Sequence, residues 1–115
     1  LGFALSLKEE WENSAEELTE ANRIRPNNPE ILRSLGWVLF KKGDKVRGIV
    51  TLERSLNLDS DNTLCLCDLG VCYLEAQNFQ KAQALLTRAL DLDPSNERAR
   101  ECSEMVSRMK RRTQG

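Results

Sequence analysis

The chain has 115 residues, 40% of them hydrophobic, and its 17 Lys and Arg against 18 Asp and Glu give a formal net charge of −1. This length suits one modest hydrophobic core, and the balanced charge argues against binding nucleic acid or an anionic membrane. The chain has no apolar run near the roughly 20 residues that a membrane-spanning helix needs, and its first residues lack the features of a signal peptide. We therefore expect a soluble protein with no nucleic-acid partner and no membrane insertion.

One pattern of residues recurs along the chain with a fixed period. Leu35-Gly36 recurs as Leu69-Gly70, an offset of 34 residues (69 − 35), and the chain begins with Leu1-Gly2 one period earlier. A fixed period of this size is typical of a repeat array. Because the first copy starts partway into the unit, we expect the chain to be a fragment of a longer protein.

The first copy predicts two helical segments. Residues 1–7 are expected to end a helix, residues 8–10 to turn the chain, and residues 11–24 to form the next helix, because small or apolar residues recur there at helical spacing. The run from Pro26 to Pro29 then ends this helix and begins another, since asparagine is a favoured cap and proline suits the first helical position.

The second copy predicts a helical hairpin. Its helices are expected over residues 29–42 and 45–58, with Asp44 as the cap of the second one. Gly36 and Gly48 lie one in each helix, where glycine costs about 1 kcal/mol relative to alanine. We therefore predict that the two helix backbones approach closely at these glycines.

The third copy repeats the hairpin, and a last helix follows it. Helices are expected over residues 63–76 and 79–92, and then from Asn96 to about Arg112 with Ser95 as its cap. Where the earlier copies carry the Leu-Gly pair, the last helix has Ser103-Glu104. A polar face of this kind is expected of a helix that closes a repeat array against water.

The pattern resembles a known family, the tetratricopeptide repeat. That unit is a helix-turn-helix of about 34 residues with a Trp-x-x-Leu-Gly-x-x-Tyr pattern in its first helix, followed by alanines and a proline. The two earlier copies match it less closely than the third. The residues of the third copy that carry the resemblance are Leu66, Leu69, Gly70, Tyr73, Ala82, Leu86, Ala89 and Pro94.

The resemblance implies an all-α fold. In this family helix-turn-helix hairpins stack into an α-solenoid with a right-handed superhelical twist, here with a C-terminal capping helix. The alignment predicts a partial repeat at residues 1–28, complete repeats at 29–62 and 63–96, a capping helix at 97–112 and a disordered tail at 113–115.

In the family, the first helices of the repeats line a concave groove that usually binds a peptide or helix of another protein. We predict the groove residues as the first-helix positions that lie off the Leu-Gly packing stripe, with Trp37 as the main anchor. Alternatively, the tight superhelix itself or a missing N-terminal helix already covers these residues, and this possibility stays open. The predicted groove residues are Phe3, Arg33, Trp37, Phe40, Lys41, Leu64, Cys67, Val71, Leu74, Arg98 and Met105.

A known groove chemistry of the family does not match this chain. Tetratricopeptide co-chaperones hold the C-terminal carboxylate of heat-shock chaperones with lysine, arginine and asparagine side chains. The corresponding residues here include Trp37, Asp68 and Cys102, and Asp68 would repel a carboxylate. Only Arg33 and Arg98 are basic, so we expect no such clamp.

The cysteines and the missing histidine argue against metal binding and catalysis. Cys65, Cys67, Cys72 and Cys102 occupy helical positions, which favours buried reduced thiols and a cytoplasmic location over a disulfide framework. The chain has no Cys-x-x-Cys pair and no histidine, so neither a zinc site nor the usual acid-base partner of a nucleophile is present. We predict no enzyme, no cofactor and no metal.

We therefore predict a non-catalytic module that binds a protein or peptide. A self-associating scaffold that forms homo-oligomers and a regulatory domain of a larger enzyme stay open as alternatives. The basic end of the chain also stays open, as a solvated helix terminus or as an anionic docking patch. It consists of Arg108, Lys110, Arg111 and Arg112.

Overall fold

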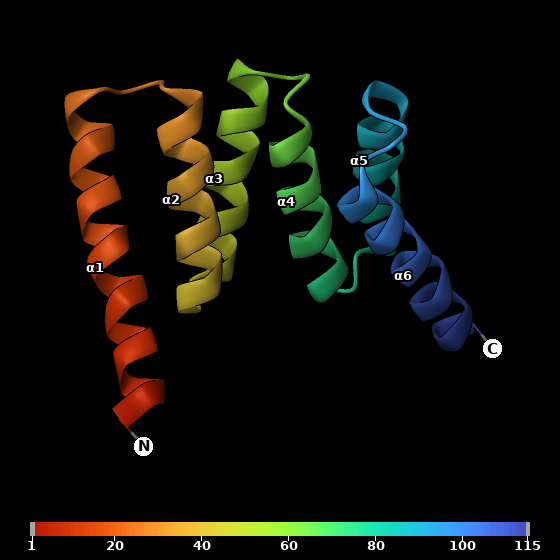
Figure 1. Cartoon of the computed structure of the whole chain (residues 1–115), viewed down its shortest axis with the longest axis horizontal. Coiled ribbons are helices and arrows are strands. Elements are labelled where there is room, and N and C mark those ends of the chain that lie inside the picture. Colours follow the sequence, from red (N-terminus) through yellow and green to blue (C-terminus); the bar gives the residue numbers. More distant parts are fainter. Residues whose placement is uncertain (1, 115) are drawn as a thin grey trace. The chain divides into compact units, whose positions relative to one another are not determined.

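The computed structural model describes the backbone of residues 2–114 and the side chains of residues 9–112. Every regular element among these residues is a helix, as predicted, and Figure 1 shows the helices in chain order. The chain divides into two compact units, residues 1–60 and 61–115. The first holds α1 (Gly2–Ile24), α2 (Pro29–Lys42) and α3 (Lys45–Leu58), and the second holds α4 (Thr63–Glu75), α5 (Phe79–Leu92) and α6 (Glu97–Gln114).

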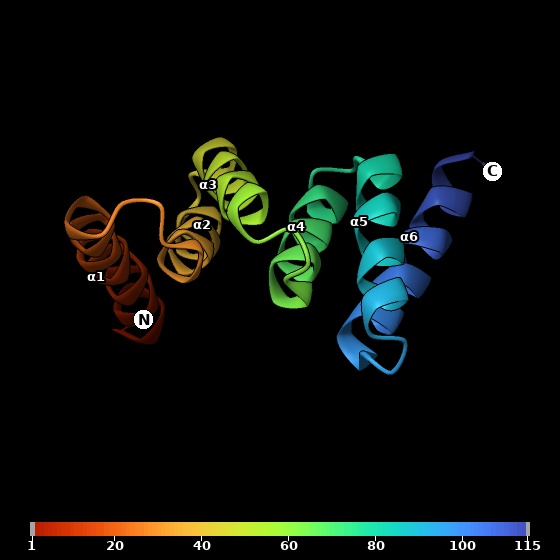
Figure 2. The same cartoon turned by 90° about the horizontal axis from the view of Figure 1, so that it is seen from above.

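The α2–α3 hairpin is held by two glycines where the helix backbones approach closely. A Cβ atom on Gly36 would lie 2.9 Å from the carbonyl oxygen of Gly48, and one on Gly48 would lie 2.7 Å from the backbone nitrogen of Phe40. Real Cβ atoms essentially never come this near to backbone atoms. The close contact that the sequence predicts is therefore present, and Figure 2 shows α2 and α3 side by side.

A buried hydroxyl joins the far ends of the same hairpin. Ser55 is fully buried, and its Oγ donates a hydrogen bond of 2.7 Å to the carbonyl oxygen of Pro29 at the start of α2. Leu32 and Leu52, also fully buried, fill the space between the two helices. A buried polar group needs a partner, and this bond provides one while tying the end of α3 to α2.

The cap expected at the start of α2 is present, whereas the one expected at the start of α3 is not. Asn28 Oδ1 accepts hydrogen bonds from the backbone N–H groups of Glu30 and Ile31, at 3.0 and 3.1 Å. Asp44 occupies the cap position of α3, but its side chain makes no capping bond. Its carboxylate lies 3.3 Å from Arg47 instead, which corrects the prediction that Asp44 caps α3.

The turn predicted at residues 8–10 is absent, since α1 is one continuous helix from Gly2 to Ile24. In the second copy the corresponding turn relies on Gly43, which adopts a left-handed φ of 117°. Glu9 and Glu10 stand at that point of the first copy, and glutamate favours a continuing helix. The first copy therefore lacks the residues that break the helix in the second.

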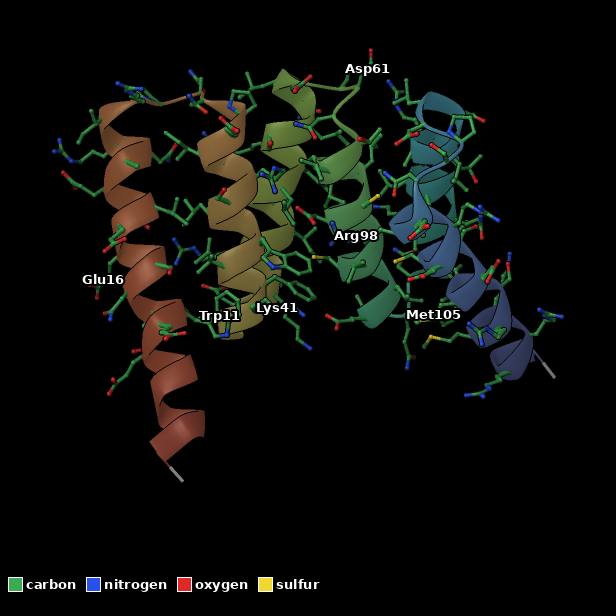
Figure 3. The ribbon with its side chains drawn as sticks, viewed as in Figure 1. Trp11, Glu16, Lys41, Asp61, Arg98 and Met105 are labelled. Atoms are coloured by element: carbon green, nitrogen blue, oxygen red, sulfur yellow. The ribbon has the colours of Figure 1, made fainter. Side chains whose placement is uncertain are left out.

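α1 packs on α2 through a small apolar core. Ala15 of α1 is buried with Leu35, Val38 and Leu39 of α2. Trp11 packs against this cluster and points from α1 toward α2 in Figure 3. The predicted apolar stripe of α1 is thus the face that meets α2.

In the second unit, α5 packs between α4 and α6. A Cβ atom on Gly70 would lie 2.8 Å from side-chain atoms of Leu86, whereas no backbone atom is that near. Ala99 and Val106 attach α6 to the unit, and both are fully buried. The second hairpin is therefore close-packed through a side chain rather than backbone to backbone.

The start and the end of α6 differ from the prediction. Asn96, not Ser95, caps the helix, because Asn96 Oδ1 accepts from the N–H of Ala99 at 3.0 Å while Ser95 hydrogen-bonds Asp93. The backbone is helical to Gln114, so residues 113 and 114 of the expected disordered tail belong to the helix. No helix in the described part of the chain is both long and apolar enough to span a membrane.

We predict that Gly48→Ala destabilises the protein more than Gly70→Ala. The methyl group at residue 48 would meet the backbone of Phe40 and Gly36, which cannot move away cheaply, and overpacking of this kind costs about 1–3 kcal/mol. At residue 70 it would meet only the flexible end of Leu86, and the better helix propensity of alanine offsets part of the cost. Urea unfolding followed by circular dichroism measures both, and equal midpoints would contradict the prediction.

Candidate functional site

Three side chains of α2 form the candidate surface of the first unit. Arg33, Trp37 and Lys41 are spaced four residues apart, which places them on one side of the helix. Arg33 and Trp37 are half-buried, whereas Lys41 is exposed. The Lys41 ammonium lies 4.8 Å from the centre of the Trp37 ring, within the range of a cation–π contact.

The candidate surface of the second unit comes from α4 and α6. Leu64 is 53% exposed, Met105 is 45% exposed, and Val71 is half-buried. Met105 also lines a shallow hollow along α6 together with Arg108, Met109 and Arg112. Exposed apolar side chains mark a binding surface when they gather into one patch, and these residues are the candidates for such a patch in the second unit.

Asp68 and Arg98 form an ion pair between α4 and α6. The carboxylate of Asp68 is almost fully buried, and its Oδ1 lies 2.7 Å from Arg98 Nη2. Arg98 retains 41% of its side-chain exposure, so only one partner of the pair is buried. The charge of Arg98 is therefore engaged within the unit by the carboxylate of Asp68.

The thiols of the second unit are shielded. Cys67 is 1% exposed, and burial raises the pKa of its thiol despite the opposing effect of the Arg98 guanidinium. Burial also raises the pKa of Cys102, which is half-buried on α6. A thiol with a raised pKa carries little thiolate at neutral pH and is a poor nucleophile. Within residues 9–112 no cluster of three or more metal-ligating side chains occurs.

Three predicted surface residues are buried. Phe40, Cys67 and Leu74 are 3%, 1% and 5% exposed, which corrects the expectation that they lie open on the first helices. Phe40 lies at the α2–α3 crossing beside Gly48, and Arg98 and Cys102 of α6 lie in the electrostatic environment of Cys67. A position off one packing stripe can still face a second neighbouring helix.

One predicted surface residue cannot be placed, and one surface residue was not predicted. The side chain of Phe3 lies outside the described residues. Sequence reasoning missed Met109, which lines the hollow with Met105, whereas Arg108 and Arg112 of the same hollow belong to the basic end of the chain named from the sequence. Met109 follows Met105 by four residues, and this helical spacing was the available signal.

One stretch of the chain matches a family model directly. Residues 63–96, which include α4 and α5, match the model described as tetratricopeptide repeat. This match covers the third copy of the sequence pattern.

Curated relatives are much longer than this chain. Tetratricopeptide repeat protein 21B of Xenopus laevis is 28% identical over 94 residues, which make up 82% of this chain and 7% of that protein. BBSome complex member BBS4 of Bos taurus is 34% identical over 65 residues, which make up 56% of this chain and 12% of that protein. The chain thus spans a small part of each of these relatives.

Solved structures share the fold at low sequence identity. The Sgt2 TPR domain from Aspergillus fumigatus has a TM-score of 0.84 at 16% identity and covers 99% of this chain, 78% of that chain being matched. The first TPR of Spaghetti (RPAP3), solved bound to the HSP90 peptide SRMEEVD, has a TM-score of 0.83 at 17% identity and covers 94% of this chain and 86% of that chain. At these identities the likeness concerns the fold alone.

We predict that Arg98→Ala destabilises the second unit more than Asp68→Asn does. Removing Arg98 leaves a buried carboxylate without its cation, whereas removing the Asp68 charge leaves a guanidinium that water already reaches. The free energies of unfolding of the two variants should differ by about 2 kcal/mol. This is less than the cost of breaking a fully buried ion pair, because Arg98 is partly exposed. Urea midpoints of the two variants measure it, and the reverse order would contradict the prediction.

We also predict slow alkylation of the native thiols. Because burial raises the pKa of Cys67 and Cys102, the thiolate fraction at pH 7 is below that of an ordinary cysteine and grows as the pH rises. Iodoacetamide should therefore react many-fold more slowly with the native chain than with the urea-unfolded chain, and at Cys102 before Cys67. Mass spectrometry locates the adducts, and rapid labelling of Cys67 at neutral pH would contradict the prediction.

Proposed function

The chain belongs to the tetratricopeptide repeat family, and on that premise we propose that it is a non-catalytic module that binds a peptide or helical segment of a partner protein. The observation that carries the proposal is the half-buried Trp37 on α2, held under the Lys41 ammonium. A structure of the same fold is bound to a peptide, the HSP90 peptide SRMEEVD, and this likeness supports the proposal without identifying the partner.

Trp37 is the proposed anchor. Tryptophan is among the residue types that contribute most to binding when a partner covers them, and burying a large side chain contributes about 1.5–3 kcal/mol. The Lys41 ammonium lies over one face of the ring and restricts its rotamers in the free chain. Trp37 would therefore lose less conformational entropy when a partner binds. Arg33 lies four residues earlier, on the same side of α2.

In the second unit the proposed contacts are mainly apolar. Leu64, Val71 and Met105 offer side-chain area, while Arg98 is engaged by Asp68. We therefore propose that internal apolar side chains of the ligand, rather than a terminal carboxylate, supply most of the affinity. Buried thiols are compatible with a reducing compartment, and we propose a cytoplasmic location.

The test is a binding measurement with a selected peptide. Peptides chosen by display on the wild-type chain are labelled, and their dissociation constants are measured by fluorescence anisotropy. Trp37→Glu is expected to raise the dissociation constant at least about tenfold, because a charge would replace the anchor. The matched control is Val46→Glu, which places the same charge at a residue of α3 that is 74% exposed and outside the proposed surface.

The control should bind within about twofold of the wild type, and both variants should keep the helical circular dichroism spectrum. If Trp37→Glu binds like the wild type, the α2 surface is not the site. If Val46→Glu loses binding to the same degree, the effect is one of net charge and not of the anchor.

A further inference from the structure

The second half of α6 carries positive charge beside exposed methionines. Residues 105–112 contain four basic residues and no acidic one. Met105, Arg108, Met109 and Arg112 line one shallow hollow and are called the α6 strip from here on. Among the described side chains, neither Arg108 nor Arg112 has an ion-pair partner, so the strip presents uncompensated charge.

The described part of α1 carries the opposite charge. Residues 9–22 contain six glutamates and no basic residue. Glu16 projects from α1 on the side away from α2 in Figure 3, opposite the packed side of Trp11. The exposed α1 acidic face comprises Glu9, Glu12, Glu16 and Glu17, and Glu20 beside it pairs with Arg23 at 2.6 Å.

We infer that the chain associates with itself head to tail, the α6 strip of one copy docking on the α1 acidic face of a second copy. Because the two docking surfaces differ, an assembly of any length still has a free α1 acidic face at one end and a free α6 strip at the other. A contact of this heterologous type grows into an open chain unless its rotation closes a ring. The inference shares Met105 with the proposed peptide surface but rests on the charges and not on that function.

A second copy fits the α6 strip better than other anionic occupants do. The strip contains no aromatic side chain on which nucleic-acid bases could stack. Its two methionines offer flexible apolar contacts suited to a protein surface, and they are too few to insert into a bilayer. The near-zero net charge also means that two copies do not repel each other as a whole.

Another run of basic residues lies at the α2–α3 turn, but three of its charges have contacts within the first unit. Lys41 lies over the ring of Trp37, and Lys45 lies 5.8 Å from the ring centre of Phe40. Arg47 pairs with Asp44 at 3.3 Å. The turn is therefore a weaker acceptor for the α1 acidic face than the α6 strip is.

A single exposed ion pair contributes little to the free energy of association. The proposed association therefore depends on several ion pairs acting together and on low salt. Sedimentation equilibrium of the wild type over a wide concentration range should show a mass that rises with concentration at about 20 mM salt and falls to the monomer at about 500 mM. A wild type that stays monomeric at low salt would overturn the inference. This holds even if the chain then binds phosphatidylserine vesicles or single-stranded DNA, because the partner of the α6 strip would be one of these and not a second copy.

Charge reversal tests the docking directly. One variant carries Glu9→Lys, Glu12→Lys and Glu16→Lys, and the other carries Arg108→Glu, Arg111→Glu and Arg112→Glu. Each alone has two ends of like charge and should be monomeric. Mixed in equal amounts, each end meets an opposite charge, so association should return. Mixing that restores nothing would overturn the inference.

The matched control carries Lys42→Glu, Lys45→Glu and Arg54→Glu, which change the net charge as much as the α6 reversal does. These residues are exposed on α2 and α3, outside both docking surfaces. The control should associate like the wild type within about twofold, with unchanged circular dichroism. Loss of association in the control would overturn the inference. Association that persists in each of the two reversal variants alone would overturn it as well.

Discussion

The close approach of two helix backbones at Gly36 and Gly48 is the constraint on which the first unit depends. Because neither position has room for a Cβ atom, the backbones of α2 and α3 come into close contact at these two glycines. This contact fixes the rotation of α2 about its axis. Leu35 then faces α1 in the core, and Trp37 is left only half-buried. The candidate surface is thus a consequence of how the hairpin packs.

Buried polar groups shape the surfaces as much as the apolar core does. Ser55 satisfies its hydroxyl on the Pro29 carbonyl and so joins the ends of a hairpin. The pair of Asp68 and Arg98 joins α4 to α6, and it also uses the cation that would otherwise face a ligand. A single ion pair therefore helps attach the last helix, and under the proposed function it also disfavours a ligand that binds through a carboxylate.

Much of the fold could be predicted from the sequence, because turn chemistry repeats with the period. The helices at residues 29–42, 45–58 and 79–92 have the predicted bounds. The prediction failed at residues 8–10, where glutamates replace the turn residues of the other copies. The site was harder to predict. Burial of Phe40 depends on a second packing contact, and the pairing of Asp68 with Arg98 joins residues that no periodic pattern links.

The placement of the aromatic residues gives the two units different optical signals. Both tryptophans of the chain, Trp11 and Trp37, belong to the first unit, and the only tyrosine, Tyr73, belongs to the second. Emission excited at the red edge of indole absorption therefore arises from the first unit alone. The packed ring of Trp11 and the half-buried ring of Trp37 differ in solvent contact, so this emission can follow α1 and the α2 surface while the second unit stays silent.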